Sequence, residues 1–116
     1  MAEVLGTFEQ AVLLSLVRPS TALGKEAYGR AVLKEVQLRL DRQVSAGAVY
    51  STLDRLEQKG LISSELRAGD QSRSGLQRRC YTIEPSGIRA LNEAKAAADK
   101  MWAGVRWPLK GAHEKG

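Results

Sequence analysis

A short stretch in the middle of the chain combines small residues with hydrogen-bonding side chains. It begins at Ser45 and continues through Ala46, Gly47, Tyr50 and Ser51. Ser45 is a good helix N-cap, and the free N–H groups and positive dipole of a helix start attract phosphate oxygens. Small residues let a backbone approach another surface closely, and hydroxyl groups bind phosphates or base edges. This stretch is therefore a candidate surface for binding nucleic acid.

A run of arginines supplies a second set of groups suited to phosphate. Residues 67–79 contain four arginines and one acid, Asp70. The four are Arg67, Arg73, Arg78 and Arg79. We expect the last three to contact nucleic acid, with Arg73 foremost because it lies at the tip of an expected turn; the alternative is a solvated basic turn. Arg55, one turn beyond Ser51, fits a phosphate contact and an ion pair with nearby acids equally well.

The composition of the whole chain narrows the function classes. Its 116 residues carry a net charge of +5, which suits an acidic partner. No apolar run approaches the ~20 residues that span a bilayer, and the first ten residues do not resemble a secretory signal, so we expect a cytoplasmic protein. One cysteine and one histidine leave no cluster for a metal. No Ser/His/Asp set or glycine-rich phosphate loop is evident, so we expect neither an enzyme nor a cofactor.

Apolar residues at three- and four-residue spacing predict three helices in the first half of the chain. They run from Thr7 to Pro19, from Glu26 to Leu40 and from Ser45 to Lys59. Thr7 and Gln10 have the form of a capping box. Gly29, inside the second helix, indicates a close helix–helix crossing. The third helix carries a narrow apolar stripe, which faces a core; it consists of Val49, Leu53 and Leu56.

A change to two-residue alternation predicts a hairpin after the third helix. Its strands are expected at Leu61–Leu66 and Arg78–Ile83, joined by the turn-forming residues 69–77. Such a hairpin is marginal alone and must pack on the helices. Cys80 is expected to be a small, half-buried strand residue rather than a redox sensor.

A long last helix is predicted from Ser86, its expected N-cap, to Trp107, where Pro108 ends it. Its apolar residues are Ile88, Leu91, Ala94, Ala98, Met101, Trp102 and Val105. This stripe is longer than one small core can cover, so we expect it to form a homodimer interface. Trp102, with Ala98 and Met101, is also a candidate slot for a planar aromatic ligand. Residues 111–116 are expected to be a disordered tail.

The order of the expected elements defines a fold class. Three helices followed by a hairpin form a winged helix-turn-helix, here residues 1–84, and residues 85–110 add the dimerisation helix. The protein is thus expected to be mainly α with a small β hairpin. In this arrangement the third helix enters the DNA major groove and the hairpin, or wing, contacts the flanking backbone. We expect Tyr50 to contact DNA, the alternative being packing against the second helix.

Four stretches also carry a family resemblance. They are Leu5–Val17, Glu26–Gly29, Ser45–Ser64 (SAGAVYSTLDRLEQKGLISS, the most specific) and Arg78–Leu91. They resemble the PadR family of bacterial transcriptional regulators, although Cys80 replaces the first of two adjacent tyrosines common there. The resemblance implies a homodimer on a pseudo-palindromic double-stranded DNA site, usually a repressor relieved by a small molecule. The alternative is a winged-helix module that binds a partner protein and not DNA.

Overall fold

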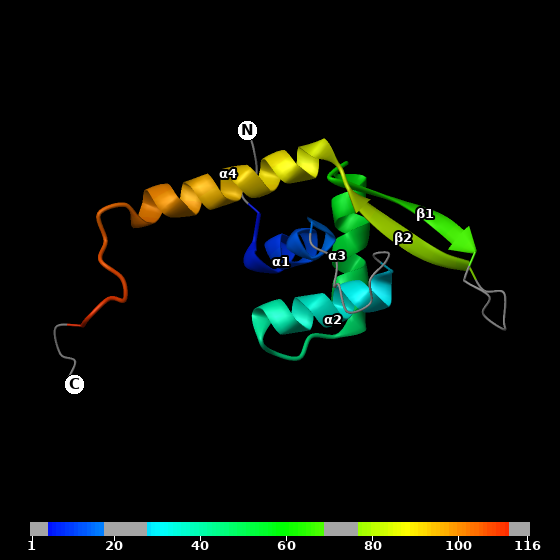
Figure 1. Ribbon diagram of the computed structural model, residues 1–116, viewed down its shortest axis with the longest axis horizontal. Coiled ribbons are helices and arrows are strands. Elements are labelled where there is room, and N and C mark those ends of the chain that lie inside the picture. The colour runs from blue at the N-terminus through cyan, green and yellow to red at the C-terminus, as the bar shows by residue number, and fades with distance from the viewer. Residues whose placement is uncertain (1–4, 18–27, 69–76, 112–116) are drawn as a thin grey trace.

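The computed structural model describes residues 5–17, 28–68 and 77–111. The elements are α1 (Thr7–Val17), α2 (Gly29–Leu40), α3 (Ala46–Gln58), β1 (Ile62–Ala68), β2 (Gln77–Ile83) and α4 (Pro85–Trp102). The first three helices form a cluster, from which the hairpin and α4 extend in opposite directions (Figure 1). The predicted fold class, mainly α with a two-stranded wing, is confirmed.

The hydrophobic core lies between the first three helices. The stripe predicted for the third helix is confirmed, because Val49, Leu53 and Leu56 are each 0% exposed. Thr52 is buried beside them, while α1 contributes Val12 and Leu13 and α2 contributes Val32 and Val36. The core holds α3 by one narrow face, so the opposite face of that helix is left for other contacts.

The start of α1 differs from the predicted capping box by one residue. The helix begins at Thr7, so the capping position is Gly6 and the third helical residue is Glu9. The Gly6 N–H donates to the Glu9 carboxylate at 3.1 Å, and the Gln10 amide donates to the Leu5 carbonyl at 2.9 Å. The expected pair of Thr7 and Gln10 is therefore wrong. Pro19, expected to end the helix, lies outside the described residues.

The second helix begins later than predicted, at Gly29. Tyr28 is extended (φ −76°, ψ 157°) and its backbone forms an isolated bridge with Cys80 of β2. Pairing with a distant strand thus keeps Tyr28 out of the helix. Gly29 is the first helical residue rather than an interior one, but the predicted close crossing is confirmed: a Cβ atom there would lie 2.7 Å from the Tyr50 Cζ atom of α3.

The wing is a regular antiparallel hairpin. Its strands pair from Ile62 opposite Ile83 to Ala68 opposite Gln77. Cys80 is buried rather than half-buried, because the backbone of Tyr28 covers this part of β2. The connecting residues 69–76, which include Arg73, lie outside the described residues.

The limits of α4 correct two predictions. Its N-cap is Glu84 rather than Ser86, whose hydroxyl donates instead to the Gly60 carbonyl at 2.6 Å. The helix ends at Trp102 and not at Trp107, because Gly104 takes a positive φ of 80°, a conformation that ends helices. Val105 therefore lies beyond the helix. The expected tail, apart from Gly111, is outside the described residues.

The two halves of α4 have different surroundings. Ala94 is buried and Leu91 packs against the core, whereas Ile88 is 38% exposed. Beyond them the helix projects past the helical cluster (Figure 1). There Met101 is 73% exposed and Trp102 is 43% exposed. The far half of α4 therefore presents large apolar side chains that this chain alone does not cover.

Glu9 joins the start of α1 to the end of α3. Its carboxylate lies 3.3 Å from the Lys59 ammonium and 3.9 Å from the Arg55 Nε atom. Burial raises the pKa of Glu9. The Gly6 N–H, Lys59 and Arg55 together lower this pKa by more than burial raises it, so it lies below its usual value of 4.5. The ionised carboxylate therefore stabilises the fold above about pH 4.5, and this contribution is lost as the pH falls through the lowered pKa.

We accordingly expect Glu9→Gln to lower the free energy of unfolding by about 0.5–1 kcal/mol at neutral pH, since glutamine keeps the shape but loses the charge. Denaturant titrations should show this difference shrinking below pH 4.5. Glu93→Gln, an exposed change on α4, is the control and should show no such dependence. A difference as large near pH 3 as at pH 7 would contradict the assignment.

Candidate nucleic-acid interface

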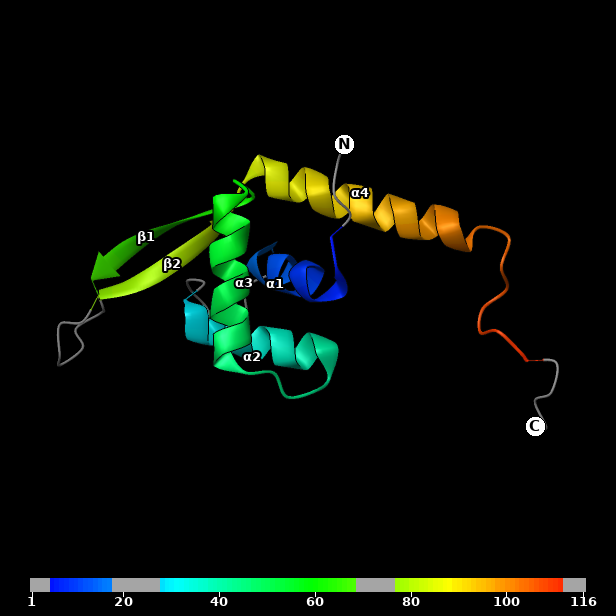
Figure 2. The same cartoon turned by 180° about the vertical axis from the view of Figure 1, so that it is seen from behind.

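The outward face of α3 is a single ridge of small and polar residues. It consists of Gly47, Ser51, Asp54 and Gln58, spaced by four, three and four residues and all exposed. In the view of Figure 2, α3 lies nearest the viewer, with the wing on one side and α1 on the other. A Cβ atom at Gly47 would meet nothing within 4 Å. Asp54 and Gln58 were not among the predicted site residues, although their spacing from Ser51 places them on the same face of the helix.

The start of α3 is formed as predicted. The Ser45 hydroxyl accepts a hydrogen bond from the Ala48 N–H at 3.0 Å, so Ser45 is the N-cap. Ser45, Ala46 and Gly47 are all exposed. The first turn of α3 is therefore accessible and carries no bulky side chain.

One arginine-lined pocket lies on the wing side of this ridge, between the start of α2, α3 and β2. Its volume is about 320 Å³. It is lined by Tyr28, Gly29, Arg30, Tyr50, Arg78, Arg79 and Tyr81. Burial raises the pKa of Tyr81, so its hydroxyl keeps its proton at neutral pH. The pocket therefore combines positive charge with neutral phenol groups, a suitable lining for a phosphate.

Tyr50 lines this pocket and packs against the second helix, as its alternative interpretation expected. Its ring lies against the start of α2 at Gly29, and the side chain is nevertheless 42% exposed. Part of its surface therefore remains accessible despite this packing.

The two wing arginines of this pocket are held differently. The Arg78 guanidinium lies over the Tyr28 ring, 4.8 Å from its centre, and such a cation–π contact leaves the N–H groups at its edge for a ligand. Arg79 instead donates to the Ser64 hydroxyl at 2.9 Å, and Ser64 donates to the Glu57 carboxylate of α3 at 2.8 Å. Arg79 therefore ties the wing to α3, whereas Arg78 is poised for an outside anion.

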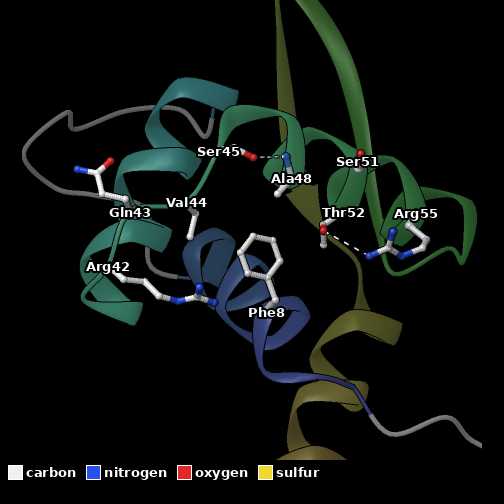
Figure 3. Close-up of a pocket in the computed structure, with 9 residues that line it drawn as sticks. All are labelled: Phe8, Arg42, Gln43, Val44, Ser45, Ala48, Ser51, Thr52 and Arg55. Carbon is white, nitrogen blue, oxygen red and sulfur yellow. Dashed lines mark hydrogen bonds between the residues drawn. The ribbon is translucent and has the colours of Figure 1, made fainter.

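A second pocket lies on the other flank of α3, against α1 and the turn that precedes α3. Its volume is about 590 Å³. It is lined by Phe8, Arg42, Gln43, Val44, Ser45, Ala48, Ser51, Thr52 and Arg55. Figure 3 shows Arg42 and Arg55 on either side of the Phe8 ring. Arg55 donates to the Thr52 hydroxyl at 3.4 Å and faces Glu9, so the predicted ion pair is present.

The two pockets place arginines on both flanks of the α3 ridge. Arg30 and Arg42 were not among the predicted site residues; Arg30 belongs to the start of α2, and Arg42 to the turn that precedes α3. The nearby acids Glu9 and Glu57 are each bonded to a neighbouring side chain. The ridge is therefore bordered by positive charge on each side.

The described part of the chain offers neither a metal-binding cluster nor a membrane-spanning helix. Residues 5–17, 28–68 and 77–111 contain no group of three or more His, Cys, Asp or Glu side chains placed to hold a metal ion. The helices within those ranges are also too short or too polar to cross a membrane.

The three-helix cluster with its two-stranded wing defines the winged helix-turn-helix class. Residues 21–93 match the Transcriptional regulator PadR-like family, and the chain belongs to that family. It is accordingly a transcriptional regulator and not an enzyme.

Known relatives support this assignment along most of the chain. Transcriptional regulator Rv3488 of Mycobacterium tuberculosis is 38% identical over 80 residues, which cover 69% of this chain and 70% of that protein. A PadR-like regulator from Bacillus cereus has a similar structure, with a TM-score of 0.64 and 26% identity over 83% of this chain and 84% of that chain. A regulator from Eggerthella lenta gives a TM-score of 0.59 and 30% identity, over 81% and 76% of the two chains.

Proposed function

We propose that this protein is a homodimeric, sequence-specific DNA-binding repressor, acting in the cytoplasm, whose α3 enters the major groove. The observation that carries this proposal is the polar ridge of α3 with arginines on both flanks. The major groove is ~12 Å wide and admits one helix between two phosphate backbones. The ridge would then contact base edges, while the flanking arginines contact phosphates.

Within this proposal, the predicted α3 residues have distinct roles. Ala46 and Gly47 allow close approach, and Ser51 meets a base edge or a phosphate. Tyr50 and Arg78 contact one backbone from the wing-side pocket, and Arg55 faces the other backbone. Arg73, outside the described residues, stays a candidate contact at the wing tip.

The dimer follows from the far half of α4. Exposed Met101 and Trp102 provide an apolar surface that a second copy would cover in a two-fold arrangement. Such a dimer places two copies of α3 on half-sites ~34 Å apart on a pseudo-palindromic operator. A dimer bound at a promoter would exclude the transcription machinery, which is repression.

Salt dependence tests DNA binding and separates it from the alternative of a protein-interaction module. We expect a steep loss of DNA affinity with salt, and Arg78→Ala should reduce the slope of log K against log[salt] by about one. Arg79→Ala should reduce it less, because Ser64 holds that guanidinium. Arg89→Ala on α4 is the charge-matched control and should leave the slope unchanged. A wild-type protein whose binding ignores salt would favour the protein-interaction module.

A planar aromatic inducer fits the same dimer interface. Trp102 of each copy would face its mate near the two-fold axis, with Ala98 and Met101 beside it, and would stack on a flat ligand. Because the chain has two tryptophans, each single Trp→Phe variant keeps one fluorescent reporter. We expect planar aromatics to quench the wild type and Trp107→Phe but not Trp102→Phe. Quenching that persists in Trp102→Phe would place the ligand elsewhere.

A further inference from the structure

Asp54 is an acid in the middle of the surface that the proposed function places against DNA. It lies on the α3 ridge, three residues after Ser51 and four before Gln58, and its side chain is exposed. At 1.5 Å per residue it is ~12 Å along the helix from Ala46, within the first three turns. A helix lying in the groove brings these turns close to the bases.

Asp54 differs from the other acids around α3 in making no hydrogen bond or ion pair among the described residues, although its charge helps to raise the pKa of Tyr81. Glu9 pairs with Lys59, and Glu57 accepts hydrogen bonds from Ser64. Neither a hydrogen bond nor an ion pair engages the Asp54 carboxylate within the described ranges. The small residues before it on the ridge, Gly47 and Ser51, do not hold the helix away from a partner.

An unpaired carboxylate here weakens binding to any DNA on which it finds no donor, because it is repelled by phosphates and by acceptor groups on the bases. In the major groove, guanine offers only acceptors, and thymine offers an acceptor and a methyl group. Adenine offers a donor beside an acceptor. Cytosine presents its N4 amino group as a donor, which a carboxylate accepts well.

We propose that Asp54 is a specificity-determining residue, which selects cytosine at one position of each half-site by accepting a hydrogen bond from the N4 amino group. This inference rests on the proposed function, since it requires α3 in the major groove. Asp54 therefore gives up affinity for most sequences in return for discrimination of roughly tenfold to a hundredfold at that base pair.

The test is selection of binding sites from a random DNA library by the wild type and by Asp54→Asn. The wild type should enrich a two-fold symmetric motif with a fixed cytosine in each half. Asparagine pairs with adenine N6 and N7, so Asp54→Asn should change that position to adenine and leave the others unchanged. The variant should also bind non-specific DNA several-fold more tightly, because one negative charge is gone.

Asp41→Asn is the matched control. It removes the same charge from an exposed residue outside α3, and asparagine tolerates the φ of 54° found there. Asp41→Asn should still enrich sites with cytosine at that position. If the wild type enriches no motif, the proposed function itself fails. If the wild type and Asp54→Asn enrich the same motif, DNA recognition stands and the role of Asp54 is overturned.

Discussion

Met101→Asp is expected to convert the proposed dimer into a monomer and to weaken operator binding by about 10²- to 10⁴-fold. Met101 is 73% exposed on the far half of α4, so aspartate would be tolerated in a lone chain. In the dimer it would place two carboxylates in an apolar contact, where unpaired charge is strongly disfavoured. A monomer engages one half-site at a time and loses the gain from linked binding.

Sedimentation and operator titration measure the two effects. Leu38→Asp is the matched control, because Leu38 is 74% exposed on α2 and lies outside α4. It should remain a dimer and bind the operator as the wild type does. If Met101→Asp sediments as a dimer, α4 does not form the interface. If the wild type is a monomer at high concentration, the protein does not dimerise.

The second large effect is expected at Gly87, in the first turn of α4. A Cβ atom there would collide with the Leu61 carbonyl and would lie 2.8 Å from the Ile83 Cγ1 atom. Because the Leu61 carbonyl belongs to the backbone, α4 would have to move. We expect Gly87→Ala to lower the free energy of unfolding by about 1–3 kcal/mol, despite the better helix propensity of alanine.

Gly47→Ala is the control for helix propensity alone. A Cβ atom at Gly47 meets nothing within 4 Å, so this change should stabilise the protein by about 0.5–1 kcal/mol. Urea titrations at one protein concentration measure both variants, since the stability of the proposed dimer would depend on concentration. Equal stability of the two variants would show that the start of α4 has room to adjust.

Local signals were sufficient to predict α3 and the end of α2, but not the start of α2 or the limits of α4. Ser45 and Gly60 bracket α3 in the sequence, and a narrow apolar stripe identifies its buried face. The start of α2 depends on pairing between Tyr28 and Cys80, which lie far apart in the chain, so no local pattern reveals it. The end of α4 is set by Gly104, which is a local signal, whereas the predicted end lay at Pro108.

The candidate site shows the same division between local and long-range information. Tyr50 and Ser51 were predicted from α3 itself. Arg30 lines one flanking pocket because the fold brings the start of α2 beside α3. Arg42 lies in the turn just before α3, but its pocket is completed by Phe8 of α1, which is distant in the sequence. The difference between Arg78 and Arg79 also depends on the fold, because it arises from the neighbour that each side chain contacts.

The direct passage from β2 into α4 has a mechanical consequence. A single residue, Glu84, separates the wing strand from the helix, and Gly87 lets the first turn of α4 sit tightly on the hairpin. The 18 residues of α4 then act as a lever ~27 Å long. If α4 rotates by about 5° about its far end, the winged domain at its other end moves by roughly 2 Å. The step between base pairs is ~3.4 Å. A slight change in how two such levers cross would therefore take both α3 helices out of register with their half-sites.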